Sequence, residues 1–254
     1  MPIYDSPSTT AKSLKGLHLY HFVFSNCSQR VRLALAEKKL SWVSHHLDLT
    51  KNEHINLEYQ ALNPKGVVPT LINDGEVVVE SNDILFYLED KFPEVSLTPK
   101  SPADQSVMEA HIQLSGKSQN SFKAHTFDQL FRKMGTMSKE DLRFLEGHRE
   151  NAEVVQFMED FQENGDVWRL RVDAASQEIV DVLSRLNDAL IHRPWLSGHQ
   201  YGLADISWVV NIYRLTLTGY DLEPYASLLE WFDRVSSRKA FADAVTQYNP
   251  LENQ

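Results

Sequence analysis

The chain has 254 residues, of which 42% are hydrophobic and 24% are charged, and its formal net charge is −10. These proportions are ordinary for a globular protein, and the length allows one large or two small domains with a substantial core. The acidic balance and the lack of any run of basic residues argue against a nucleic-acid surface, and no apolar stretch reaches the roughly 18 residues that a transmembrane helix needs.

The first fifteen residues contain no hydrophobic segment, so we interpret them as a flexible lead rather than a signal peptide. Cys27 is the single cysteine, which excludes an internal disulfide framework and favours a reducing compartment. We therefore expect a cytoplasmic protein whose partners include neither nucleic acid nor a membrane.

The residues that follow alternate between strand and helix patterns. In chain order they predict a strand at residues 17–22, a helix at 29–39, a second strand at about 41–48, and a stretch with helical potential up to residue 62. The first helix has one face made by Val31, Ala34, Leu35 and Lys38, which we expect to pack on a sheet.

Two β-branched runs, residues 67–72 and 76–79, flank Asp74-Gly75. Asp-Gly between apolar runs is a strong hairpin signal, because a type I′ turn needs a positive φ at both central positions. Pro69 within the first run indicates either an edge strand or a cis peptide bond. The polar residues that follow Val79 precede an apolar helical pattern and predict a helix N-terminus, where free N–H groups and the helix dipole favour an anion. The alternative is an ordinary strand, turn and capped helix.

The order β-α-β-(α)-β-β-α predicts an α/β thioredoxin-like N-terminal domain with a mixed four-stranded sheet at residues 16–99. Three prolines between residues 92 and 102 mark a linker, and residues 103–248 read as an all-α C-terminal helical domain. Residues 172–191 form its clearest amphipathic helix. The preceding stretch, residues 109–165, is polar and contains six phenylalanines: Phe122, Phe127, Phe131, Phe144, Phe157 and Phe161.

A helix start is also predicted near the C-terminal end. With Gly202 as the N-cap, the carboxylate of Asp205 can reach back to the Gly202 N–H, and Tyr201 and Ile206 form a hydrophobic staple. Asp205 is therefore interpreted as a folding residue. Glycine as the N-cap costs about a few tenths of a kcal/mol relative to the best capping residues.

Ser25, Asn26, Cys27 and Ser28 lie between the first strand and the first helix and are the candidate catalytic residues. A thiolate at this point meets free N–H groups, the positive end of the helix and hydroxyl donors, which are conditions that lower a thiol pKa from about 8.5 to about 3.5–7.5. The alternative is that Ser25 and Asn26 cap the helix and that Cys27 is a buried apolar residue.

The stretch from Asn63 to Asp83 resembles the glutathione-binding half of glutathione S-transferases, and the resemblance extends closely over residues 16–99 and more loosely over 103–248. It implies that Pro69 is cis and that the backbone of Val68 pairs with the cysteinyl backbone of glutathione. It also implies that Glu80 and Ser81 hold the γ-glutamyl group. Lys51 and Lys65 complete the glutathione-binding set that it implies.

The motif SNCSQRVRLALAEK resembles the S-x-C-x-x-[RK]-x-R pattern of zeta-class transferases and tetrachlorohydroquinone reductive dehalogenases. The resemblance implies that Ser25 activates the glutathione thiol, as in zeta enzymes, or that Cys27 attacks a glutathionyl intermediate, as in the dehalogenases. Asn26 replaces the second serine of zeta enzymes, which argues against maleylacetoacetate isomerase activity. Asn and Ser also occupy this loop in the bacterial β-aryl etherases of lignin breakdown.

We therefore expect a glutathione S-transferase that uses the thiolate of its co-substrate glutathione to displace a leaving group from a small aromatic electrophile, with β-aryl ether cleavage as one such reaction. Reductive dehalogenation and maleylacetoacetate isomerisation are the alternative reactions. A non-catalytic glutathione-fold binding protein is the alternative of another class, and the presence together of Ser25, Val68-Pro69 and Glu80-Ser81 favours the enzyme.

No metal site is predicted, because His45 and His46 are strand neighbours whose side chains point to opposite faces. His111 and His125 are interpreted as surface residues of the helical domain. The family resemblance further implies a dimer, with an identical or a different partner, in which Asp83 reaches the glutathione of the neighbouring subunit.

Overall fold

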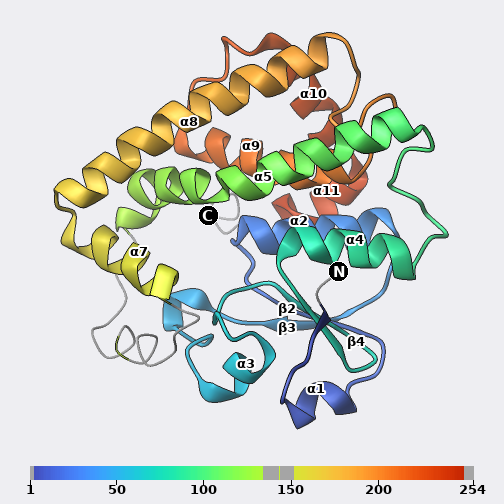
Figure 1. The fold of residues 1–254 in the computed structure, drawn as a ribbon, viewed down its shortest axis with the longest axis vertical. Coiled ribbons are helices and arrows are strands. Elements are labelled where there is room, and N and C mark those ends of the chain that lie inside the picture. The colour runs from blue at the N-terminus through green and yellow to red at the C-terminus, as the bar shows by residue number, and fades with distance from the viewer. Residues whose placement is uncertain (1–2, 134–142, 144–151, 249–254) are drawn as a thin grey trace.

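The structure is a computed structural model that describes residues 3–133, 143 and 152–248 (Figure 1). Its sheet contains five strands: β1 (Ile3–Tyr4), β2 (Leu17–His21), β3 (Val43–His46), β4 (Thr70–Asn73) and β5 (Glu76–Val79). Their order is β1-β5-β4-β2-β3, in which β2 and β3 are parallel and the other neighbours are antiparallel. This is the predicted mixed sheet of a thioredoxin-like domain, with one strand more than expected.

The additional strand lies in the N-terminal segment, for which the prediction of a flexible lead was wrong. Ile3 pairs with Val78 at the edge of the sheet, and α1 (Thr9–Ser13) follows. Ser8 caps α1 by accepting a hydrogen bond from the backbone N–H of Ala11, a residue that is fully buried. A two-residue strand and a five-residue helix are too short to show a periodic pattern, and their order depends on contacts with β5.

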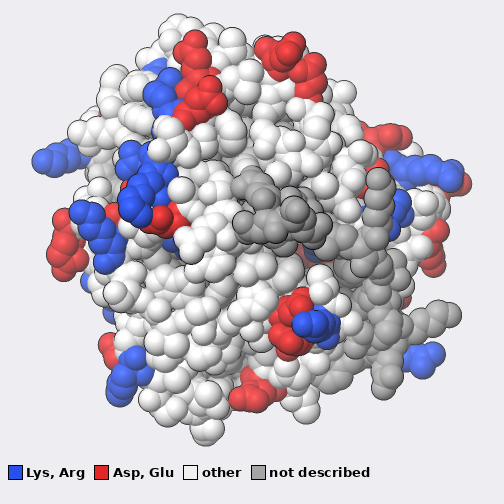
Figure 2. Space-filling view, turned by 180° about the vertical axis from the view of Figure 1, so that it is seen from behind, with Lys and Arg blue, Asp and Glu red and all other residues white. Residues whose placement is uncertain are grey.

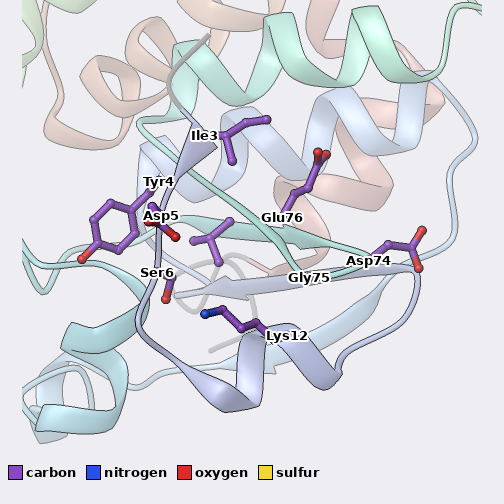
Figure 3. Close-up of a pocket in the computed structure, with 9 residues that line it drawn as sticks. Ile3, Tyr4, Asp5, Ser6, Lys12, Asp74, Gly75 and Glu76 are labelled. Carbon is purple, nitrogen blue, oxygen red and sulfur yellow. The ribbon is translucent and has the colours of Figure 1, made fainter.

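The N-terminal segment and the hairpin turn enclose a hollow of about 350 Å³ (Figure 3). Lys12 of α1 lies on one side of it, and Asp74, Gly75 and Glu76 lie on another. The hollow is at the end of β4 opposite to Pro69, so it is separate from the predicted glutathione site.

The hairpin has the predicted turn, with φ values of 48° at Asp74 and 91° at Gly75. Both central residues therefore have the positive φ that a type I′ turn requires. The Val68–Pro69 peptide bond is cis, as the family resemblance implied. Pro69 precedes β4 by one residue, which explains how a proline is tolerated next to an interior strand.

Helices cover both faces of the sheet (Figure 1). On one face, Leu71 and Val78 pack in the core that includes α2 (Asn26–Glu37) and α4 (Ser81–Lys91). On the other face, Ile72 and Val77 pack with α1, α3 (Leu57–Leu62) and the segment around Val68. The predicted face of α2 is confirmed, since its four residues are all buried.

The described residues of the C-terminal half form helices and connecting loops, as predicted, with one isolated β-bridge between Trp195 and Gly198. This half contains α5 (Pro102–Gln129), α7 (Ala152–Glu163), α8 (Asp166–Ile191), α9 (Leu203–Thr218), α10 (Ala226–Ser236) and α11 (Lys239–Ala244), with 3-10 turns at Phe131–Lys133 and Thr246–Tyr248; a third such turn, Leu49–Lys51, follows β3. The long helices α5 and α8 run above α2 and α4, and α9 is seen between α5 and α8 (Figure 1). One hydrophobic core includes residues of α2, α4, α5, α8 and α9, so it is continuous between the two halves.

The start of α9 keeps the predicted capping pair and adds a third residue to it. The carboxylate of Asp205 accepts the Gly202 N–H at 2.9 Å, while the hydroxyl of Ser197 accepts the Ala204 N–H at 3.0 Å. A Cβ at Gly202 would lie 2.3 Å from the carbonyl oxygen of Leu97. The glycine is therefore required by close packing, and Ser197 supplies the hydroxyl that a serine or threonine cap would otherwise provide.

Charged side chains of both signs are interspersed on the face shown in Figure 2, most of them towards its edge and one group in its lower middle. No helix among the described residues is long and apolar enough to cross a membrane.

Candidate functional site

The sheet register brings the predicted glutathione-binding segments to one end of the sheet. Tyr20 near the end of β2 lies opposite Thr70 at the start of β4, and Thr70 also pairs with Val79 at the end of β5. The parallel strand β3 ends beside β2, with His46 next to His21. Four predicted segments therefore meet at this end of the sheet. Ser25–Ser28 follow β2, Lys51 follows β3, Glu80–Ser81 follow β5, and Val68–Pro69 precede β4.

Ser25 is the N-cap of α2, and its hydroxyl oxygen accepts the Ser28 N–H at 3.3 Å. Its hydroxyl proton is left available for an acceptor outside the helix. The side chain of Ser28 is fully buried and accepts the Phe22 N–H at 3.3 Å, so it fixes the turn between β2 and α2. Cys27 is half-buried rather than enclosed in the core, which does not agree with a purely apolar role.

Asn26 has an amide whose orientation follows from its partners. Its Oδ1 accepts the Cys27 N–H at 3.0 Å, and its Nδ2 donates to Oδ1 of Asn211 at 2.8 Å. Because a backbone N–H can only donate, Oδ1 of Asn26 must face Cys27. The amide therefore connects the first turn of α2 to α9 of the helical half.

Three cationic side chains lie within electrostatic reach of Cys27: Arg30 and Arg214 are buried, and Lys123 is half-buried. Burial lowers the pKa of Lys123 to about 8 and that of Arg214 to about 10, and it also lowers the pKa of Arg30. A negative charge at Cys27 would raise all three pKa values. The first turn of α2 is therefore surrounded by positive charge supplied by three different helices.

Arg30 connects the two halves of the molecule. Its guanidinium is 1% exposed and donates to four neutral groups: the Ser207 carbonyl at 3.1 Å, the Ser81 hydroxyl at 2.7 Å, and Ser115 and Gln119 at 3.2 Å. A buried cation with only neutral acceptors gains from an anion nearby. Since one acceptor is Ser81, the predicted holder of the γ-glutamyl carboxylate, the residues present fit a carboxylate at this point.

The backbone before the cis proline is held by side chains of the neighbouring loop. The carbonyl oxygen of Val67 accepts a hydrogen bond from the Tyr59 hydroxyl at 2.7 Å and another from Nδ2 of Asn63 at 2.8 Å. Tyr59 and Asn63 therefore position Val68, the residue implied to pair with the glutathione backbone.

The remaining predicted residues differ in their surroundings. Glu80 has a φ of 65° ahead of α4, and its exposed carboxylate pairs with Lys65 at 2.8 Å. Ser81 is buried beneath it. Lys51 is at the same end of the sheet, but its ion pair is with Asp48 at 3.1 Å rather than with another predicted site residue.

An aromatic cluster in the helical half borders this region. The Phe131 ring lies 5.6 Å from Phe24, which precedes Ser25, and 5.0 Å from Phe127, while Phe157 lies 5.1 Å from Phe127. The Lys123 ammonium is 4.0 Å from the centre of the Phe157 ring. Of the other phenylalanines singled out in the sequence, Phe161 joins this cluster, Phe122 packs on Trp208 in the core, and Phe144 lies outside the described residues.

The prediction of surface roles for His111 and His125 was wrong, because both are half-buried and hydrogen-bonded. Nδ1 of His111 donates to the Leu196 carbonyl at 2.7 Å, and Nε2 of His125 lies 3.0 Å from the Thr218 hydroxyl. Over the part of the chain that the structure describes, no group of three or more His, Cys, Asp or Glu side chains is arranged to hold a metal ion.

Two family models match the chain. The glutathione S-transferase N-terminal domain matches residues 19–96, and the glutathione S-transferase C-terminal domain matches residues 170–234. The chain belongs to the glutathione S-transferase family. Glutathione is therefore its co-substrate.

Three similar proteins illustrate the range of this family. Glutathione S-transferase 1 of Dianthus caryophyllus is 44% identical over 84 residues, which are 33% of this chain and 38% of that protein. Tetrachloro-p-hydroquinone reductive dehalogenase of Sphingobium chlorophenolicum is 28% identical over 243 residues, which cover 89% of the present chain and 94% of the dehalogenase. The crystal structure of β-etherase LigF from Sphingobium sp. strain SYK-6 has a TM-score of 0.81 at 24% identity and covers 94% of this chain and 99% of that one, which shows a common fold.

Several residues of the site were missed by sequence reasoning. Arg30 was noted only as part of a motif, and Lys123, Asn211 and Arg214 were not singled out. The one available signal was the presence of charged or amide side chains on otherwise apolar helical faces, as for Asn211 and Arg214 within α9.

Proposed function

We propose that this transferase uses glutathione to displace an oxygen leaving group from an aromatic substrate, as in β-aryl ether cleavage. The observation that carries the proposal is the amide of Asn26, held by Cys27 and Asn211 between the N-terminus of α2 and the helical half. The Phe24 and Phe131 rings pack together next to the start of α2 and are suited to a phenyl group.

The roles follow from the positions of the residues. Ser25 donates a hydrogen bond from its hydroxyl to the glutathione sulfur and so favours the thiolate. Val68 binds the glutathione backbone, Ser81 the γ-glutamyl carboxylate, and Glu80 the γ-glutamyl amine. Lys65, paired with Glu80, and Lys51 lie at the rim, where exposed ammonium groups can attract the remaining glycine carboxylate.

The reaction is a substitution at the carbon that carries the ether oxygen. The sulfur forms a bond to that carbon, the carbon–oxygen bond breaks, and the phenolate that leaves takes up a proton. The Asn26 amide is held at both ends, by the Cys27 N–H at its oxygen and by Asn211 at its nitrogen, so we assign Asn26 to positioning. Lys123, whose pKa is lowered by burial to about 8, is able to supply the proton.

Reductive dehalogenation is the second candidate, and Cys27 is the observation that favours it. Cys27 is half-buried beside three cationic groups, in surroundings that suit attack by a thiolate on the sulfur of a glutathionyl adduct. In that step a sulfur–sulfur bond forms between Cys27 and glutathione, the carbon–sulfur bond of the adduct breaks, and the ring carbon takes up a proton to give the reduced aromatic product. A further thiol must then reduce the disulfide.

Product mass spectrometry distinguishes the two reactions. Wild type and Cys27→Ser are each incubated with glutathione and either a β-aryl ether or a chlorinated hydroquinone. The proposal predicts a glutathionyl adduct from the ether, with most of the activity retained in Cys27→Ser. Release of a reduced aromatic product by wild type, replaced by an adduct in Cys27→Ser, would identify the dehalogenase reaction instead.

An activated aryl halide separates these enzymes from a non-catalytic binding protein. Retention on glutathione resin together with conjugation of the halide supports a transferase even when neither specific substrate reacts. Retention on the resin without conjugation of any electrophile would contradict the proposed activity.

A further inference from the structure

Asn211 and Arg214 lie one turn apart on α9 and face the loop that carries Asn26. They are 0% and 2% exposed, respectively. The orientation of Asn211 is fixed, because its Oδ1 accepts from Nδ2 of Asn26, whose own Oδ1 is held by Cys27. Nδ2 of Asn211 is therefore a donor, and it has no partner among the described residues.

Arg214 has a similar excess of donors. One of its terminal nitrogens donates to the Phe24 carbonyl, and its guanidinium carbon lies 4.0 Å from the centre of the Phe24 ring. Its Nε is buried and is also without a partner in the described part of the chain. Residues three apart on a helix lie on the same face, so both unpaired donors belong to one surface of α9.

Unpaired buried donors are costly, because each has lost its hydrogen bonds to water without replacement. The charge around the two donors indicates which kind of acceptor would form the missing hydrogen bonds. Arg214 and Arg30 contact neutral acceptors, and Lys123 lies over the Phe127 and Phe157 rings. The local excess of positive charge favours an anionic oxygen over a neutral one.

We propose that Nδ2 of Asn211 and Nε of Arg214 bind an anionic oxygen of the second substrate, a carboxylate or a phenolate, while its ring packs against Phe24 and Phe131. Asn211 and Arg214 are then specificity-determining residues that select acidic aromatic electrophiles. The inference rests on the proposed transferase function and extends it to the substrate class. It also explains why Asn26 is tied to α9, since that contact sets the direction in which the Asn211 amide donates.

The test compares two electrophiles with the same reacting ring, a chlorodinitrobenzoate and its methyl ester. Wild type should prefer the acid in kcat/KM. Asn211→Leu and Arg214→Lys should each lower the ratio of kcat/KM for the acid to kcat/KM for the ester by about tenfold to a hundredfold, as expected for loss of a hydrogen bond to a charged group. Asn211→Leu also removes the partner of Asn26, so it should lower kcat/KM for both electrophiles, and for the acid by the larger factor. Thr216→Ala, an exposed position of α9, is the matched control and should change neither substrate.

Binding of unreactive nitrobenzoate, measured by calorimetry in the presence of an S-alkyl glutathione, gives a readout that does not depend on turnover. Weaker binding in Asn211→Leu and Arg214→Lys, with wild-type unfolding temperatures, supports the assignment. Equal losses for acid and ester would overturn it and would indicate a general structural effect. Failure of wild type to conjugate either electrophile would instead contradict the proposed function, while the calorimetry would still test the oxygen site.

Discussion

Ser81→Ala removes an oxygen that serves both the fold and the predicted glutathione site. In the structure this oxygen accepts a hydrogen bond from the buried guanidinium of Arg30 at 2.7 Å, and Ser81 itself is 7% exposed. Loss of a hydrogen bond to a charged group costs about 1.5–3 kcal/mol. We therefore expect the free energy of unfolding to fall by about this amount, and glutathione affinity to fall by about 1–3 kcal/mol, or about fivefold to 150-fold.

Urea unfolding and calorimetric titration with glutathione measure the two effects separately. Ser115→Ala is the matched control, because Ser115 also accepts from Arg30, at 3.2 Å, but belongs to α5 of the helical half. It should lower stability while leaving glutathione affinity near that of wild type. Unchanged affinity in Ser81→Ala would remove Ser81 from the glutathione site, and equal affinity losses in both variants would mean that Arg30, rather than Ser81, controls binding.

Three further predictions concern stability and assembly. Gly202→Ser should destabilise the protein in thermal unfolding despite serine being a good N-cap, because its Cβ would approach the Leu97 carbonyl oxygen to 2.3 Å; a raised melting temperature would contradict this. Burial and the neighbouring Arg32 lower the pKa of His21 from 6.5 to about 3. Below pH about 6, His21 binds a proton in the unfolded chain but not in the folded chain. The free energy of unfolding should therefore fall by up to about 1.4 kcal/mol per pH unit as the pH drops from about 6 towards 3. His21→Gln should make this pH dependence weaker. Finally, we expect a dimer in sedimentation at micromolar concentration, and a monomer there would refute it.

Features that depend on local sequence were predicted well. The hairpin at Asp74-Gly75 follows from the φ that its turn requires, and the buried face of α8 follows from the spacing of its apolar residues. The capping role of Asp205 was also visible, since its partner is three residues away. Each of these features depends on residues that are close together in the chain, so the local sequence pattern is enough to predict it.

Features that depend on distant partners were not predictable. The edge strand β1 forms because Ile3 pairs with Val78, and nothing in the sequence around either residue predicts this pairing. Arg30 is held by Ser81, Ser115 and Ser207, which are contributed by three other helices. The sequence indicated the candidate glutathione-binding residues of the N-terminal half, but the donors supplied by α9 became apparent only from the packing of the two halves.

The proposed function depends above all on the stabilisation of the bound glutathione thiolate by Ser25. The ultraviolet absorbance of the thiolate, followed across pH in the complex, tests it most directly, with Ser28→Ala as a control whose hydroxyl faces the Phe22 N–H. We predict that the midpoint lies below that of free glutathione in wild type and in Ser28→Ala, and rises by about 1–2 pH units in Ser25→Ala. An identical midpoint in wild type and Ser25→Ala would contradict the account.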